Sequence, residues 1–446
     1  MKKMQTGFCL MALCFGTVYE ANASSAKVPC PVPLKTCPAP LDKNLPDVKN
    51  MLTWTPQQRV VGFRNDYRSY PGDIFHASKA GVPLPVAHRN LSAVSYEYQQ
   101  HHYSLADYLK RNNVTGMMVI KDGKKVWDYY GHGNTKTTLW TSRSVGKSVV
   151  STLVGIALKQ GKIASLDDEV VKYNPEARGT AWEHVPLRSL LQHTSGVTWN
   201  EDYTNPQSDF AKLTQCEAGK DTYDCVSKLV LDPQRKAYAK PGQIWSYSSG
   251  GAWVLGDTLE KATGETLARN LQDNIWQPYG MVNDGVWHSY LPGKHDVGAH
   301  GFNATLEDWG KFGLFVMNNG ILPDGTKTLP EGWVKEASTW NKAENSVTTD
   351  YPDGQFGYQW WNIGVPLSAK NDAPSEGLTR NKTLSAEGIF GQMIAIDQAQ
   401  KLVIVQWSAW PQAEPASDAQ PLEASLMFNA IANALSGASA SPAKNR

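Results

Sequence analysis

A run of apolar and small side chains from Val149 to Leu158 constrains the fold of this chain more than any other feature. A helix over this run has no polar face, and such helices lie in the interior of large proteins. Gly161 follows as a residue suited to the turn that ends a helix. The sequence therefore predicts a buried helix that begins near Ser144 and ends before Gly161.

Two polar residues, Ser144 and Lys147, stand at the start of this predicted helix. Residues three apart share one helix face, so the two side chains are expected to meet. Burial can lower a lysine pKa from about 10.4 by roughly 3–5 units, and a neutral amine can activate a hydroxyl. Alternatively, Lys147 reaches the surface and Ser144 only caps the helix. The spacing alone does not decide, because Ser-x-x-Lys also occurs at Ser24 and Ser441.

Gly146-Lys147-Ser148 resembles the end of a phosphate-binding loop. That loop needs a glycine five residues before Gly146, where this chain has Thr141. The chain of 446 residues carries 43 basic and 42 acidic residues, without a long run of either sign. Nucleotide binding, nucleic-acid binding and electrostatic membrane binding are therefore not expected.

The first 23 residues have the pattern of a secretory signal peptide. Lys2 and Lys3 precede an apolar run from Phe8 to Tyr19, and Ala21-Asn22-Ala23 follows as a small-x-small cleavage site. The apolar run is too short for a permanent membrane span, and no comparable stretch follows. We expect a periplasmic or secreted protein without a membrane anchor.

The predicted mature chain keeps four cysteines: Cys30, Cys37, Cys216 and Cys225. An even number in an exported chain favours disulfides. Of the three possible pairings, we favour the local bonds Cys30–Cys37 and Cys216–Cys225. A metal site is the weaker alternative, since the cysteines lack zinc-ligand spacing. No metal site or other cofactor is expected elsewhere.

Composition divides the chain into regions. A proline-rich and loop-rich arm is predicted over residues 24–95, and a single large domain over residues 96–435. Within that domain, residues 165–290 read as an inserted, mainly helical lobe. Residues 436–446 form a small, polar tail that is predicted to be disordered.

The order of strands and helices predicts an α+β fold. Strand-like runs at Gly116–Ile120 and Lys125–Tyr130 flank a turn, and two more follow at Met393–Ile396 and Leu402–Trp407. We expect an antiparallel sheet built from both ends of the chain, with helices on its faces and an all-helical lobe. Further predicted helices cover Ser104–Asn112, Val185–Gly196, Ala252–Ala262, Asn303–Met317 and Pro421–Leu435.

Several polar and aromatic residues are candidates for a site beside Ser144. Tyr247 lies among small residues at a turn into a helix, where its phenol could face a cleft. Tyr203 competes for the same role. His193 resembles a triad member, although a histidine at a helix end is more often structural. In the strand-like Gln359-Trp360-Trp361, alternation sends one indole inward and the other outward.

Several of these segments together resemble the serine β-lactamase and penicillin-recognising family. The chain is more closely similar to the nylon-oligomer branch, the 6-aminohexanoate-dimer hydrolases, over roughly Trp54 to Leu435. The segments that carry the likeness are Ser144–Lys147, Leu190–Gly196, Asn200–Tyr203, Tyr247–Ser249, Tyr351–Gly354, Gln359–Trp361, Gly388–Gln392 and Ser408–Pro411.

The resemblance implies roles for individual residues. Ser144 would be the nucleophile, Lys147 its base and Tyr247 the proton relay to the leaving group. Tyr203 would bond the departing amine, and Trp361 would lie along the substrate channel. The N–H groups of Ser144 and of Gly388 or Ile389 would form the oxyanion hole. His300 would have either a pocket-lining or a structural role.

The chain also departs from the β-lactamase pattern. Ser385-Ala386-Glu387 stands where those enzymes have Lys-Thr-Gly, so the cation that meets a β-lactam carboxylate is missing. The export signal and cysteines also differ from a cytoplasmic nylon-oligomer enzyme. We expect a serine hydrolase for small carboxylic esters and short linear amides. The alternatives are a class C-like β-lactamase or D-stereospecific peptidase, and a non-catalytic binding protein on the same fold.

Overall fold

The computed structural model describes residues 42, 44–339, 343, 356–362, 383–414 and 419–436. The predicted signal peptide, Cys30 and Cys37, and the tail beyond residue 436 lie outside the described residues. Within the described ranges, no helix combines the length and apolarity needed to cross a bilayer.

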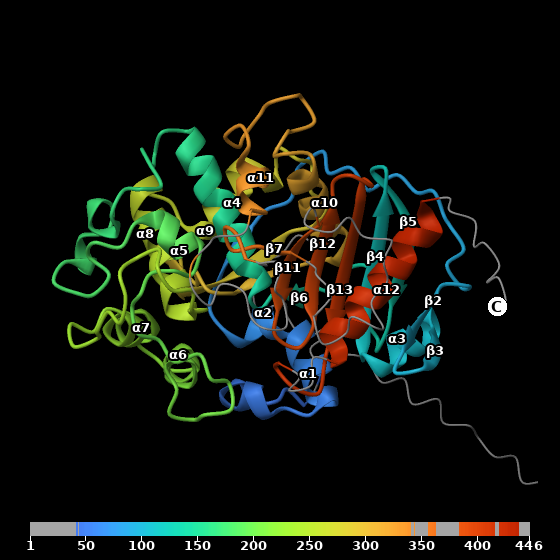
Figure 1. Cartoon of the computed structure of the whole chain (residues 1–446), viewed down its shortest axis with the longest axis horizontal. Helices are drawn as coiled ribbons and strands as arrows, with labels where there is room; N and C mark the ends of the chain where they lie inside the picture. The colour runs from blue at the N-terminus through green and yellow to red at the C-terminus, as the bar shows by residue number, and fades with distance from the viewer. Residues whose placement is uncertain are drawn as a thin grey trace, which may run out of the picture.

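A six-stranded antiparallel sheet lies at the centre and joins the two ends of the chain (Figure 1). Strand β13 pairs with β4, which places Val403 opposite Ile120 and Val405 opposite Met118. The sheet runs in the order β10 (Trp361–Asn362), β11 (Thr383–Gly388), β12 (Gln392–Asp397), β13 (Leu402–Ser408), β4 (Val114–Lys121), β5 (Lys124–Tyr130). The predicted α+β class and the four predicted strands are confirmed.

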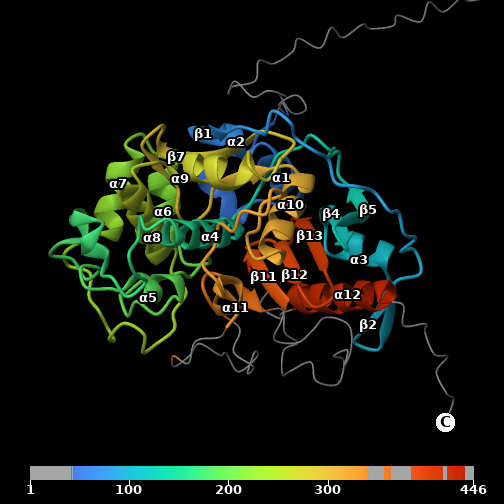
Figure 2. The same cartoon turned by 90° about the horizontal axis from the view of Figure 1, so that it is seen from above.

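Helices cover both faces of this sheet, because its central strands carry apolar residues on both sides. In β4, Met118 and Ile120 face the core that contains α4 (Val145–Lys159) and α10 (Leu306–Met317). Met117 and Val119 face the opposite core with α3 (Leu105–Arg111) and α12 (Ala419–Leu435). Alternation along a strand produces this division. Figures 1 and 2 show α12 across one face and α10 behind the other.

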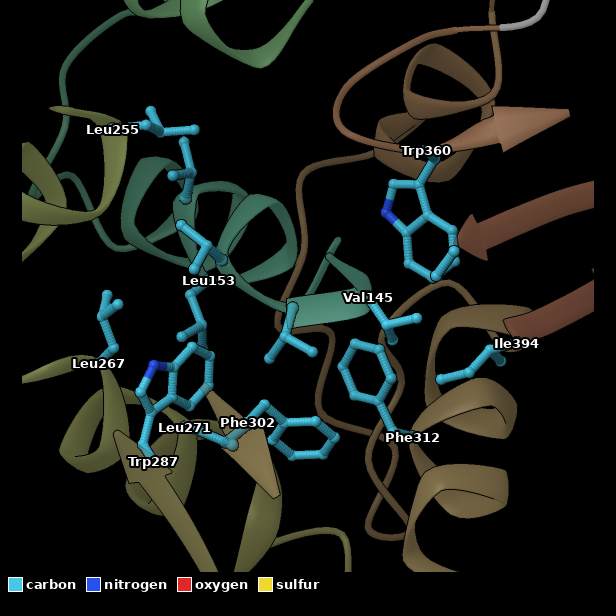
Figure 3. Close-up of a cluster of buried hydrophobic side chains, with 14 of the residues drawn as sticks. Val145, Leu153, Leu255, Leu267, Leu271, Trp287, Phe302, Phe312, Trp360 and Ile394 are labelled. Atoms are coloured by element: carbon cyan, nitrogen blue, oxygen red, sulfur yellow. The ribbon is translucent and has the colours of Figure 1, made fainter. Parts of the chain in front are cut away.

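Helix α4 is the buried central helix that the sequence predicts. Every residue from Val145 to Ala157 is buried. Its side chains join the sheet to the second half of the molecule, and Figure 3 shows Val145 near Phe312 and Leu153 among the residues of the lobe. The helix ends at Lys159, and Gly161 follows with a positive φ of 71°.

A second antiparallel sheet was not predicted. It runs β1 (Gly72–Phe75), β7 (Gly285–Leu291), β9 (Phe302–Ala304), β6 (Trp140–Thr141), with β8 (His295–Asp296) beside β7. The expected sheet built from both ends of the chain is present, and this second sheet adds to it. Its β1–β7 and β6–β9 pairs join strands far apart in the sequence, which leaves no local signal for them. Residues 303 and 304 belong to β9, so α10 begins at Leu306 rather than at Asn303.

The predicted lobe is mainly helical, but it ends in strand β7. Its helices are α5 (Leu187–Leu191), α6 (Asp209–Glu217), α7 (Thr222–Val230), α8 (Ser249–Thr263) and α9 (Leu267–Leu271), with short helices η2 (Val170–Lys172), η3 (Pro175–Ala177) and η4 (Gln272–Trp276). Helix α5 is shorter than predicted, since the chain turns at His193 with a positive φ of 54°.

The region before the main sheet is more ordered than the predicted loop. Helix α1 (Pro56–Arg64) begins with a capping box between Thr55 and Gln58, a signal that the sequence analysis missed. The remaining elements are η1 (Val48–Thr53), α2 (Asp66–Ser69), β2 (Ser95–Tyr98), β3 (His101–Ser104) and α11 (Trp333–Ala337).

Candidate active site

Ser144 lies at the turn between β6 and the first residue of α4. Arg143 adopts a positive φ of 46° at this turn, which redirects the chain from strand to helix. The Ser144 side chain makes no capping hydrogen bond to the helix backbone. Ser144 therefore occupies the N-cap position of α4, but its hydroxyl does not cap the helix and contacts Lys147 instead.

Lys147 points into the protein rather than toward solvent. Its side chain is buried, and Nζ donates to Ser144 Oγ at 2.9 Å and to the Ala299 carbonyl at 2.8 Å. Burial lowers the pKa of Lys147 to about 8, although the charges of Glu201 and Glu217 oppose this shift. The neutral fraction near neutral pH is therefore much larger than for an ordinary lysine, and this amine contacts the hydroxyl.

Tyr247 completes a group of three side chains at this point. The Lys147 Nζ lies 5.1 Å from the centre of the Tyr247 ring, and the Tyr247 phenol is hydrogen-bonded to the Ser144 side chain. Burial, reinforced by the charge of Glu201, holds the Tyr247 pKa well above its usual range. The phenol is therefore protonated at neutral pH and can donate a proton.

Aromatic rings fix the orientation of Tyr247. Trp361 stacks on it at 5.9 Å between centroids, and the His193 ring lies at 4.4 Å. Burial and the charge of Lys147 lower the His193 pKa well below its usual range, so the imidazole is neutral. His193 Nδ1 accepts from the Ser248 N–H, an arrangement that fits a structural role rather than a triad. Trp360 is buried and Trp361 is half-buried, as alternation predicts.

The end of β11 approaches the start of α4 closely. A Cβ on Gly388 would lie 3.0 Å from the Ser144 nitrogen and 2.7 Å from the Ser142 oxygen. Only glycine allows the two backbones this proximity. The backbone of Gly388 and the Ser144 nitrogen therefore meet beside the Ser144 hydroxyl, where a carbonyl oxygen could bind.

Tyr203 is positioned by a partly buried carboxylate, Glu201, to which the sequence analysis gave no role. The Tyr203 hydroxyl donates to Glu201 Oε1 at 3.1 Å, and the Ser249 hydroxyl donates to the same oxygen at 2.6 Å. Glu201 Oε2 accepts from the Ser249 N–H at 2.9 Å and from the Trp199 indole. Burial raises the Glu201 pKa, while the Lys147 charge and these donors act against the shift.

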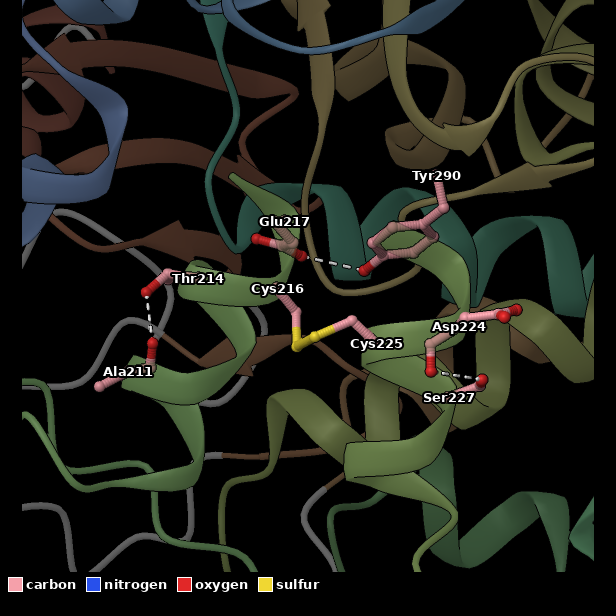
Figure 4. Close-up of a disulfide and its surroundings, with 8 residues drawn as sticks. All are labelled: Ala211, Thr214, Cys216, Glu217, Asp224, Cys225, Ser227 and Tyr290. Atoms are coloured by element: carbon pink, nitrogen blue, oxygen red, sulfur yellow. Dashed lines mark hydrogen bonds between the residues drawn. A yellow bond between two sulfur atoms is a disulfide. The ribbon is translucent and has the colours of Figure 1, made fainter. Parts of the chain in front are cut away.

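His300 lies beside the site and pairs with a second buried carboxylate. Its Nε2 lies 3.0 Å from Glu217 Oε2, and Tyr290 donates to Glu217 Oε1 at 2.9 Å. The preceding residue, Ala299, accepts the Lys147 hydrogen bond. Glu217 follows Cys216, whose predicted disulfide to Cys225 is present (Figure 4). The disulfide thus holds the segment that carries Glu217.

A narrow cavity of about 20 Å³ opens beside these residues. It is lined by Val48, Met51, Tyr70, Arg143, Ser144, Lys147, Phe210, Thr214, Glu217, Ser249, His300 and Ile389. A much larger groove of about 1290 Å³ runs along α10 and contains none of the three central residues. The chemistry of the side chains, rather than cavity size, identifies the candidate site.

An α+β fold in which a buried lysine amine contacts a serine hydroxyl defines a serine hydrolase. The chain belongs to the beta-lactamase family, because the family model described as Beta-lactamase matches residues 105–426.

Two curated relatives cover about two thirds of the chain or more. The 6-aminohexanoate-dimer hydrolase of Paenarthrobacter ureafaciens is 23% identical over 322 residues, which is 70% of this chain and 76% of the relative. A beta-lactamase of Providencia stuartii is 28% identical over 318 residues, which is 66% of this chain and 77% of the relative.

A solved structure from Bacillus anthracis, provisionally named a 6-aminohexanoate-dimer hydrolase, superposes with a TM-score of 0.73. The match has 20% identity and covers 89% of this chain and 99% of that one. The hydrolase EstCE1 gives a TM-score of 0.54 at 17% identity, over 73% of this chain and 98% of that one. Both likenesses support the fold.

Proposed function

We propose that this protein hydrolyses small carboxylic esters and short linear amides through a covalent acyl-enzyme on Ser144. The observation that carries the proposal is the 2.9 Å contact between Lys147 Nζ and Ser144 Oγ, in surroundings that lower the lysine pKa to about 8. A neutral amine at this distance can accept the hydroxyl proton as the oxygen attacks a carbonyl carbon.

The remaining residues have distinct parts in the proposed reaction. Backbone N–H groups of Ser144 and of Gly388 or Ile389 stabilise the oxyanion, each by about 3–4 kcal/mol. Tyr247 donates a proton to the departing alcohol or amine and regains one through Lys147. Water then attacks the Ser144 ester, and the same groups assist in reverse order to release the acid.

The proposed substrate class is supported by the relatives and by the absence of the Lys-Thr-Gly motif of β-lactamases. The curated relatives include a 6-aminohexanoate-dimer hydrolase and, over 34% of this chain, a lovastatin esterase of Penicillium rubens. Tyr203 would bond the departing amine, Trp361 would line the channel beside Tyr247, and His300 would border the pocket. These features favour a linear ester or amide.

A β-lactamase or D-stereospecific peptidase is the second candidate, favoured by the Providencia stuartii relative. Ser385 argues against it, because a serine hydroxyl stands at the position of the lysine and offers no cation to a β-lactam carboxylate. Glu387, two residues further on, adds no cation either, and burial raises the pKa of its carboxyl to about 7. Hydrolysis of nitrocefin or of D-Ala-D-Ala peptides at rates comparable to ester hydrolysis would favour this second candidate.

The decisive test is the Ser144→Ala variant. We expect it to lose p-nitrophenyl ester hydrolysis and labelling by a fluorophosphonate probe, while the control Ser227→Ala on α7 retains both. Release of 6-aminohexanoate from its linear dimer by the same variants measures amide cleavage. Unchanged ester hydrolysis in Ser144→Ala would refute the proposal, and an unlabelled, inactive wild type would indicate a binding protein.

We further propose that the protein is exported and that its signal peptide ends at Ala23. The Cys216–Cys225 disulfide supports this location, because such bonds persist in oxidising compartments. N-terminal sequencing of the mature protein tests it, with Ser24 expected as the first residue.

A further inference from the structure

Three potential metal ligands meet on the far part of α8, away from Ser144. Asp257 and Glu260 lie about one turn apart on this helix, and His295 lies on strand β8. One ligand atom from each lies within 4.8 Å of the others. His295 Nδ1 is 3.4 Å from Glu260 Oε2 and 3.6 Å from Asp257 Oδ1.

Glu260 provides a second, independent observation. Its side chain is only 4% exposed, and Oε2 is buried without a hydrogen-bond partner. The other oxygen, Oε1, accepts from the N–H groups of Leu267 and Asp296 at 3.1 Å and 2.9 Å. The carboxylate is therefore held in place by its first oxygen, with the second directed toward a histidine nitrogen that also lacks a hydrogen bond.

We propose that Asp257, Glu260 and His295 bind a divalent transition metal, with zinc the best match. Zinc takes imidazole nitrogen and carboxylate oxygen at about 2.0–2.1 Å in tetrahedral geometry, which separates neighbouring ligand atoms by roughly 3.3–3.4 Å. The nitrogen–oxygen separations of 3.4 and 3.6 Å are close to this value. The His295 side chain is 23% exposed, whereas its Nδ1 and Glu260 Oε2, which would face the metal, are buried.

Neighbouring groups hold the proposed ligands in orientation. The Tyr223 ring stacks on His295 with 3.9 Å between centroids, and its hydroxyl donates to Asp257 Oδ1 at 3.1 Å. Lys261 Nζ bonds the opposite oxygen, Asp257 Oδ2, at 2.8 Å, which leaves Oδ1 facing the cluster. Partners that orient ligands in this way are a general feature of metal sites.

This site lies outside the proposed reaction. Asp257 is eight residues along α8 from Ser249, which bonds Glu201, so the metal would lie roughly 12 Å along the helix from the active-site end. The metal would join α8 to β8 and stabilise the lobe. The linear sequence gives no motif for it, because His295 is distant in the chain from the helix pair.

Metal binding is measured on untagged, chelator-treated protein by titration with Zn²⁺ and by elemental analysis after dialysis. We expect one equivalent of zinc and a higher melting temperature with zinc present. His295→Phe keeps a ring to stack on Tyr223 but removes the ligand, and Glu260→Gln replaces one carboxyl oxygen by an amide nitrogen that cannot bind a metal. Each should weaken zinc binding at least tenfold.

The control is His184→Ala, which removes an exposed histidine that pairs with Glu169. It should bind one zinc with unchanged affinity. Absence of a stoichiometric zinc in the wild type, or equal affinity in the wild type and His295→Phe, would overturn the proposal and leave the cluster as a buried ion pair. Esterase activity of the metal-free protein distinguishes failure of this site from failure of the proposed function.

Discussion

At the scale of single residues, the state of Lys147 depends on two opposed effects. Burial penalises the ammonium form, whereas the charges of Glu201 and Glu217 favour it. Burial dominates, and the pKa falls to about 8. If the Lys147 amine is the base for Ser144, the reaction requires the neutral form, which is populated as the pH rises through this value.

We therefore predict that kcat/KM for an uncharged ester increases with pH and levels off above about pH 8. Lys147→Ala should lower kcat/KM by about 10²–10⁴-fold, the usual contribution of a general base. Lys159→Ala, at the exposed end of the same helix, is the control. A profile that is flat from pH 6 to about 9 would contradict the assigned role of Lys147.

The Glu201 charge allows a finer test of the same balance. Because its negative charge raises the Lys147 pKa, Glu201→Gln should lower that pKa and move the rising limb of the pH profile to lower pH. Glu265→Gln, an exposed carboxylate between α8 and α9, should leave the limb in place. A rising limb that moves to higher pH in Glu201→Gln would contradict the conclusion that the Glu201 charge raises the Lys147 pKa.

The sequence could predict which polar residues meet but not all that surround them. Ser144 and Lys147 were predictable, since a lysine within an apolar helix needs an explanation and helical spacing places it beside the serine. Tyr247 could be preferred to Tyr203 from the sequence, because the small residues at its turn allow neighbouring groups to approach closely. Glu201 lies in a segment that carries the family likeness, but the roles of Glu201 and Glu217 could not be predicted, because their effect depends on burial that tertiary contacts create.

At the scale of elements, length and apolar content decided what could be predicted. Helix α4 and the paired strands β4 and β13 are long and continuously apolar, so their patterns are unambiguous. Strands β6 and β9 have two and three residues and are defined by pairing with distant strands. No local sequence pattern indicates that β6 pairs with β9, and the second sheet was consequently not predicted.

The Cys216–Cys225 bond gives a prediction for this lobe. It links the end of α6 to α7 across a sequence separation of nine residues. The Cys216→Ser/Cys225→Ser double variant should lower the free energy of unfolding by roughly 2–3 kcal/mol, because the unfolded chain gains freedom. Urea unfolding of oxidised wild type and double variant measures this difference. Equal stabilities would show that the bond does not constrain the unfolded chain.

At the scale of the whole molecule, segments from the beginning and the end of the chain form one sheet. Strand β13 from the C-terminal part lies beside β4 from the N-terminal part, and α10 covers both. The sequence predicted this arrangement because both strand pairs are apolar and separated by helical segments. It could not predict how the second sheet joins the lobe, since those strands contact through buried aromatic side chains far apart in the chain.

Trp407 joins three of these distant segments and provides the last prediction. Its fully buried indole on β13 stacks on Trp140 of β6 at 5.6 Å and meets Trp309 of α10 edge-on at 6.0 Å. Trp407→Ala leaves a cavity among all three and should destabilise the fold by about 3–5 kcal/mol. The control Tyr238→Ala removes an exposed ring and should change stability by less than about 0.5 kcal/mol. Urea unfolding followed by fluorescence of the remaining tryptophans measures both. A loss below about 1 kcal/mol in Trp407→Ala would mean that this contact does not couple the two sheets.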